Sequence, residues 1–120
     1  MQNKSQDLSE RLLKFSVEII KLYSRISKTM PGRYIGGQLI RSASSAGANY
    51  EEACAAESRS DFIHKMQIVL KELRESLYWL KLLVATELIK AEEITWHLTE
   101  CLELIKIVAS SIITARKHMK

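Results

Sequence analysis

The chain has 120 residues, 47% of them hydrophobic and 27% charged, and its formal net charge is +4. This length fits one domain over residues 1–120, with enough apolar content for a packed core. No apolar run reaches the roughly 18 residues that a membrane-spanning helix needs, and the polar segment 1–7 lacks the apolar centre of a signal peptide. Two cysteines are too few for a disulfide framework. These properties exclude a membrane protein, a disulfide-stapled secreted domain and a disordered tail, and we expect a cytoplasmic protein.

The first expected element is an amphipathic helix that ends before the only proline. Its apolar residues recur at steps of four and three, which places them on one helix face. They are Leu8, Leu12, Phe15, Ile19, Leu22 and Ile26. Asp7 or Ser5 is the predicted cap. The helix should end at Thr29–Gly32, because Pro31 locks φ and Gly32 is flexible.

A second helix of small residues is predicted from Gln38 to Ala56, after Gly36 and Gly37. Its Ala and Ser side chains would let neighbouring helices approach closely. Polar residues at steps of four, four and three form a row along it, namely Arg41, Ser45, Asn49 and Glu52. We interpret this row as a hydrogen-bond network between helices that meets Asp61 or Arg59, because buried polar groups need partners. A pocket for a ligand or phosphate is the alternative.

Two longer helices complete the chain. Ser58 and Asp61 have the spacing of a capping box ahead of an apolar run. The stripe of this third helix is Met66, Leu70, Leu73, Leu77, Leu80 and Val84. After a short connection over Thr86–Lys90, the fourth helix carries Ile94, Leu98, Cys101, Ile105, Val108 and Ile112. Four amphipathic helices with short links predict an all-α, antiparallel up-down-up-down four-helix bundle.

The run from Gln38 to Ala53, continued by Ser58–Phe62 and by Glu75–Leu83, resembles the four-helix bundle proteins known as 23S rRNA-intervening sequence proteins. The resemblance implies a homopentameric ring, genes sometimes lodged in intervening sequences of ribosomal RNA genes, and no established enzymatic activity. The family is also similar to the accessory variability determinant of diversity-generating retroelements, a basic pentamer that binds nucleic acid and a reverse transcriptase. The chain departs from the family pattern at Ala53–Ala56, where a Gly-containing stretch is usual.

Positive charge is concentrated near the N-terminus. Residues 1–41 hold eight of the 18 basic and three of the 14 acidic side chains, so they carry +5 and the remainder −1. Five of these cations fall within an arc of roughly 100° on the first helix. This basic ribbon consists of Arg11, Lys14, Lys21, Arg25 and Lys28. Repeated around a ring, it would attract the phosphates of RNA or DNA without reading their sequence. A solvated helix face that serves solubility is the alternative, and Glu18 within the ribbon favours it.

A second apolar face lies on the back of the third helix. It consists of Ile68, Trp79 and Leu82, interleaved with Glu72 and Glu75. Exposed apolar patches mark interfaces, and Trp is enriched at their centres, so we predict that these residues join subunits. Burial by neighbouring helices of the same bundle is the alternative.

Residues for catalysis or for a cofactor are sparse. A di-iron bundle needs two Glu-x-x-His pairs and two further carboxylates, and His64, His97 and His118 do not supply them. Neither Cys54 nor Cys101 has a nearby His, so both are expected to act as small hydrophobes. We therefore expect no enzyme, no metal and no cofactor. The predicted protein is a homo-oligomer that presents its basic ribbon to RNA or DNA, and the alternative is a scaffold whose partner is a protein encoded nearby.

Overall fold

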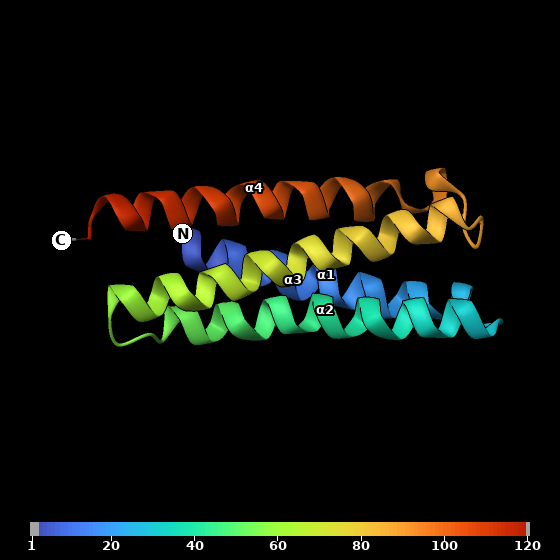
Figure 1. The fold of residues 1–120 in the computed structure, drawn as a ribbon, viewed down its shortest axis with the longest axis horizontal. Coiled ribbons are helices and arrows are strands. Elements are labelled where there is room, and N and C mark those ends of the chain that lie inside the picture. Colours follow the sequence, from blue (N-terminus) through green and yellow to red (C-terminus); the bar gives the residue numbers. More distant parts are fainter. Residues whose placement is uncertain (1–2, 120) are drawn as a thin grey trace.

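The computed structural model describes residues 3–119, which fold into four long helices and one short 3-10 helix. The elements are α1 (Lys4–Ile26), α2 (Met30–Cys54), α3 (Arg59–Ala85), η1 (Ala91–Ile94) and α4 (Thr95–Lys117). Successive long helices run in opposite directions in a rod of 50 × 28 × 19 Å, and residues 3–119 contain no β-strand (Figure 1). The predicted up-down-up-down architecture is therefore confirmed.

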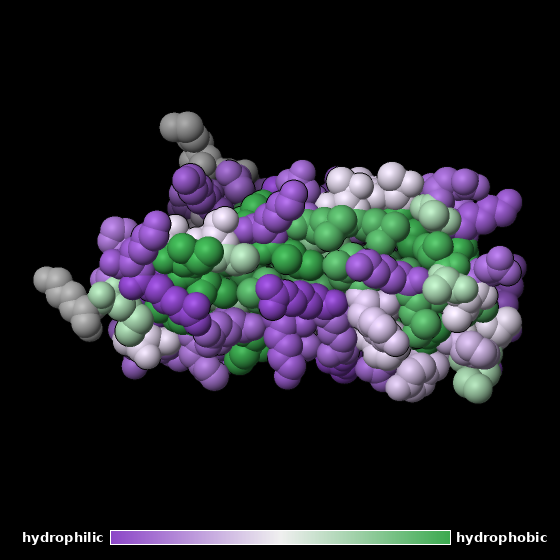
Figure 2. Space-filling view, turned by 45° about the horizontal axis from the view of Figure 1, so that its top comes forward, coloured by the Kyte–Doolittle hydropathy of each residue, from purple (hydrophilic) through white to green (hydrophobic). Residues whose placement is uncertain are grey.

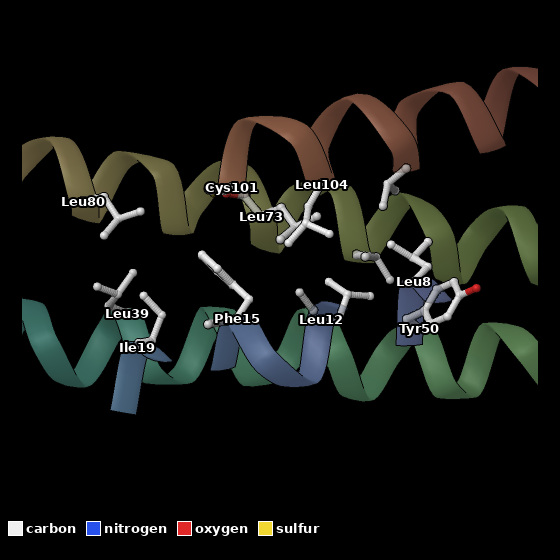
Figure 3. Packing of buried hydrophobic residues seen from close by; sticks show 14 of the residues in the cluster. Leu8, Leu12, Phe15, Ile19, Leu39, Tyr50, Leu73, Leu80, Cys101 and Leu104 are labelled. Carbon is white, nitrogen blue, oxygen red and sulfur yellow. Dashed lines mark hydrogen bonds between the residues drawn. The ribbon is translucent and has the colours of Figure 1, made fainter. Parts of the chain in front are cut away.

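In α1 all six residues of the predicted stripe are buried and belong to the hydrophobic core. Figure 3 shows Leu8, Leu12, Phe15 and Ile19 within it. The predicted cap is wrong, because the helix begins earlier. The side chain of Asn3 accepts a hydrogen bond from the backbone N–H of Gln6 at 2.9 Å and so caps the helix. Ser5 and Asp7 lie inside the first turns, where Ser5 donates its hydroxyl to Asn3.

The second helix also starts earlier than predicted, at Met30 instead of Gln38. Thr29 caps it by accepting the N–H of Gly32, and Pro31 fits the first turn, where no backbone N–H is required. Gly36 lies inside the helix and does not interrupt it. Its lack of a side chain allows α2 to pack closely against α1. A Cβ at this position would lie 2.6 Å from Cδ1 of Tyr23.

In α3 the predicted cap is confirmed, since Ser58 accepts the N–H of Asp61 at 3.0 Å. The buried stripe is rotated from the prediction, because α3 packs against α2 and also against α4. Met66, Leu73 and Leu80 are buried as predicted. The other three predicted residues, Leu70, Leu77 and Val84, are half-buried, and α3 buries Val69, Ser76 and Leu83 beside them.

The connection to α4 contains Glu87 at φ 62°, followed by the 3-10 turn η1. Four residues of the predicted fourth stripe are buried, namely Ile94, Cys101, Val108 and Ile112. Leu98 and Ile105 are half-buried, whereas Leu104 is fully buried. Figure 3 shows Leu104 and Cys101 of α4 packing above Leu73 of α3. No helix within residues 3–119 is both long and apolar enough to span a bilayer.

Candidate interaction surfaces

The basic ribbon of α1 lies beside carboxylates of the fourth helix. Arg11 donates from Nε to Glu100 Oε2 at 3.0 Å and from Nη2 to Oε1 at 2.7 Å, and Glu103 lies 3.9 Å away. The hydrogen bond to Glu100 raises the pKa of the Arg11 guanidinium above its ordinary value. This cation is therefore held in a bidentate ion pair within the chain.

The remaining ribbon cations are divided between paired and exposed side chains. Arg25 forms an ion pair with Glu93 of η1, and Lys21 lies 3.6 Å from the carboxylate of Glu18. Lys14 stacks over the ring of Trp96, with its Nζ 5.7 Å from the centroid. Lys28 is exposed and makes no ion pair with residues 3–119. Part of the ribbon's positive charge is thus compensated by carboxylates of η1 and α4. The sequence alone did not show that these acids lie beside α1.

The polar row of α2 meets partners on α3 that differ from those expected. Arg41 pairs with Glu72 at 3.3 Å and with Glu75. At the other end of the row, Glu52 accepts a hydrogen bond from Lys65 at 2.7 Å. In the middle, Asn49 donates to the backbone carbonyl of Ser45 at 2.9 Å. The row therefore joins α2 to α3 through its two ends, and neither Asp61 nor Arg59 takes part within the described residues.

Sequence reasoning missed a buried polar pair at the centre of the same helix contact. The hydroxyls of Ser42 and Ser76 are 2.7 Å apart, and both residues are fully buried. One hydroxyl donates to the other, and the accepting hydroxyl donates to a backbone carbonyl of its own helix, Leu39 for Ser42 or Glu72 for Ser76, so both groups have partners. The signal available in the sequence was that Ser42 and Ser76 each lie among the buried positions of their helices.

The predicted interface residues of α3 are half-buried. Trp79 donates its indole N–H to Glu75 at 3.0 Å and packs edge-on against Tyr34 and Tyr78. Leu82 packs against the core, and Ile68 lies about three turns before Trp79 on the same helix. Trp79 thus already has intramolecular neighbours, and the subunit contact at these residues stays a prediction.

More exposed apolar side chains lie on the outer surface of α1. Leu13 is 66% exposed and Ile20 54%, with Val17 between them at 39%. Their spacing of four and three places them on one side of the helix. We call these three residues the α1 face.

A second exposed apolar strip lies on α4. Leu102 is 47% exposed and Ile113 55%, and the half-buried Leu98 and Ile105 continue the strip toward the core. We call these four residues the α4 face. Figure 2 shows hydrophobic residues gathered in a band along the rod, with hydrophilic residues on both sides. Monomeric proteins rarely leave large contiguous apolar surface exposed.

The α1 face and the α4 face are both turned away from the seam between these helices. The seam is marked by Arg11 and Glu100. Leu13 and Leu102 each follow a seam residue by two positions, which is about 200° around a helix axis. The two faces therefore look outward from different sides of the rod.

Comparison with known proteins adds the family. The model of the 23S rRNA-intervening sequence protein family matches residues 4–110. The chain belongs to this family. The chain is also similar to a crystal structure from Bacteroides thetaiotaomicron, of a protein of unknown function from the S23 ribosomal protein family. The two sequences are 37% identical and the structures superpose with a TM-score of 0.85, over 92% of this chain and 98% of that one. No curated protein matches the chain.

The side chains that could bind a metal or take part in catalysis are not clustered in the described part of this family member. Residues 3–119 contain no group of three His, Cys, Asp or Glu placed to hold a metal ion. Cys101 is buried and bonds the carbonyl of Leu73 at 3.3 Å, and burial raises the pKa of its thiol to about 12. Burial also lowers the pKa of His97, whose Nδ1 has no hydrogen-bond partner in the described chain. Both groups therefore favour their neutral forms.

Proposed function

We propose that this protein is a non-enzymatic scaffold whose copies join head to tail, with the α1 face of one copy against the α4 face of the next. The observation that carries the proposal is the exposure of large aliphatic side chains on two separate faces, up to 66% at Leu13. Burying the exposed part of such side chains contributes on the order of 1 kcal/mol each, which favours association.

The arrangement of the faces supports a closed or open chain of copies. Leu13 and Leu102 look outward from different sides of the rod, so a contact between the two faces is heterologous and leaves one free face at each end. Such contacts give rings where the rotation closes. The pentameric ring that the family resemblance implies is one such closure.

The charge distribution favours a protein partner over a nucleic acid. Arg11 and Arg25 are held by Glu100 and Glu93, so their charge is compensated within the chain. Lys21 lies near the carboxylate of Glu18, but its side chain is 71% exposed, so its charge remains accessible to solvent. Phosphate binding through Lys14, Lys21 and Lys28 is the second candidate function, and it requires affinity for RNA that falls steeply as salt rises.

Two complementary variants test the head-to-tail contact. The first, Leu13→Glu with Ile20→Glu, disables the α1 face, and the second, Leu102→Lys with Ile113→Lys, disables the α4 face. Each variant alone should be monomeric by light scattering. Mixed together, they should form a one-to-one dimer, because each retains the face that the other lacks.

The matched control replaces exposed polar residues, Gln67→Glu with Arg74→Glu on α3, and should assemble like the unaltered protein. If the second variant still forms dimers on its own, the contact is symmetric and the head-to-tail proposal is wrong. If both variants assemble fully, neither face is an interface.

A further inference from the structure

A groove opens at the end of the bundle where α1 begins and α4 ends. α1 and α4 make the weakest contact among neighbouring long helices, and α3 crosses obliquely from the side of α2 toward α4 (Figure 1). The groove between them has a volume of about 920 Å³. Ligand pockets in proteins typically measure about 300–1,000 Å³, so this space is large enough for a small molecule.

Apolar side chains from all four long helices line the groove. They are Leu8, Ala53, Phe62, Ile107 and Ala115. Leu8 lies beside Tyr50 at one end of the core, and the hydroxyl of Tyr50 donates to the carbonyl oxygen of Ser5 at 3.2 Å (Figure 3). Tyr50 is only 4% exposed, so it offers no ring face on which a base could stack. Apart from Tyr50 and the half-buried Phe62, the apolar side chains of the lining are aliphatic, so the groove suits a hydrocarbon chain.

Three cations from three helices stand around this apolar lining. They are Lys4 of α1, Arg59 of α3 and Lys106 of α4, and no carboxylate lines the groove among the described residues. None of the three forms an ion pair with a side chain of residues 3–119, whereas Arg11 and Arg25 of the ribbon do. Uncompensated cations beside an apolar groove attract an anion that carries a hydrocarbon tail.

We propose that this groove binds a long-chain carboxylate, with its tail along Leu8, Phe62 and Ile107 and its carboxylate at Lys4, Arg59 and Lys106. Side-chain hydroxyls of Ser110, Ser111 and Thr114 also line the groove and can donate hydrogen bonds to the carboxylate. The site shares no residue with the α1 face or the α4 face, so the proposal does not rest on self-assembly.

Calorimetric titration of the intact protein with dodecanoate, kept below its micelle-forming concentration, tests the proposal. Saturable binding at one molecule per chain is expected. Dodecyltrimethylammonium has the same tail with the opposite charge, and it should bind at least about tenfold more weakly because the head group would meet the three cations. No saturable binding of dodecanoate, or equal affinity for both amphiphiles, would overturn the proposal.

Variants locate the binding to the groove. The double variant Arg59→Glu with Lys106→Glu should weaken dodecanoate binding by about tenfold or more, since two attractive charges become repulsive. The matched control Arg74→Glu with Lys81→Glu makes the same change in net charge on exposed residues outside the groove and should bind normally. Thr114→Trp, at an exposed position on the groove wall, should block the tail. Equal loss in the control, or full binding by Thr114→Trp, would show that dodecanoate binds elsewhere.

Discussion

Arg11 of α1 and Glu100 of α4 are joined by two hydrogen bonds, across the neighbouring long helices that have the weakest contact. The Glu100 side chain is only 14% exposed, whereas that of Arg11 is 38% exposed. The pair therefore holds the first and last helices together along a seam that has few apolar contacts. It also removes one cation from the surface that was predicted to bind phosphates.

Breaking this pair should weaken the bundle modestly. Arg11→Ala is expected to lower the free energy of unfolding in urea by about 0.5–1 kcal/mol, because the pair is partly exposed. A double-mutant cycle with Glu100→Ala should return a favourable coupling energy. Lys28→Ala, on the same helix but without an ion partner in residues 3–119, serves as the control. A coupling energy of zero would mean that the seam does not depend on the pair.

Adjacent glycines of α2 should respond in opposite ways to alanine. A Cβ on Gly36 would lie 2.6 Å from the ring of Tyr23, so Gly36→Ala should destabilise the protein by about 1–3 kcal/mol. At Gly37 nothing lies within 4 Å, and Gly37→Ala should stabilise the helix by up to about 1 kcal/mol. Thermal unfolding of the two variants measures both effects. Equal shifts of Tm would contradict the close contact between α1 and α2.

Stability should fall in mild acid because of His97. Burial lowers the pKa of this side chain below its ordinary value of 6.5, so the unfolded chain binds the proton more readily than the folded protein. The stability that comes from keeping His97 neutral is fully present above pH 6.5. It is lost as the pH falls through the lower pKa of His97 in the folded protein. In His97→Gln, the slope of unfolding free energy against pH just below 6.5 should become shallower. An unchanged slope in His97→Gln would contradict this assignment and show that another group carries the effect.

The two cysteines should differ in reactivity with a disulfide reagent at mildly alkaline pH. Cys54 is exposed and should react rapidly in the native protein. Cys101 is buried with its thiol pKa raised to about 12, so it should react only when the chain unfolds. Cys54→Ser should abolish the rapid phase. Rapid reaction of two thiols per native chain would show that the core around Cys101 opens easily.

The apolar periodicity predicted most of the fold. The stripe from Leu8 to Ile26 is buried throughout, because α1 presents one continuous face to the core. The prediction was wrong where glycine was treated as a helix breaker. Gly36 lies inside α2, and its lack of a side chain lets α2 pack closely against Tyr23. That reason lies in a contact between two helices, which no local pattern along α2 reveals.

The candidate surfaces were harder to predict, because they depend on which helices become neighbours. The cations of the ribbon were visible in the sequence, but their pairing with Glu93 and Glu100 required α4 to lie beside α1. Leu13 and Ile20 fall outside the buried stripe and were passed over, although their spacing already placed them on one face. The groove is lined by side chains of all four long helices, so only the assembled bundle displays it.

The mass of the unaltered protein in solution tests the scaffold proposal most directly. Sedimentation equilibrium across the micromolar range should return an average mass well above the 13.7 kDa chain mass, and this mass should not fall in high salt, because apolar contacts hold the copies together. A single species of 13.7 kDa at every concentration would contradict the account, since the α1 face and the α4 face would then remain in contact with water.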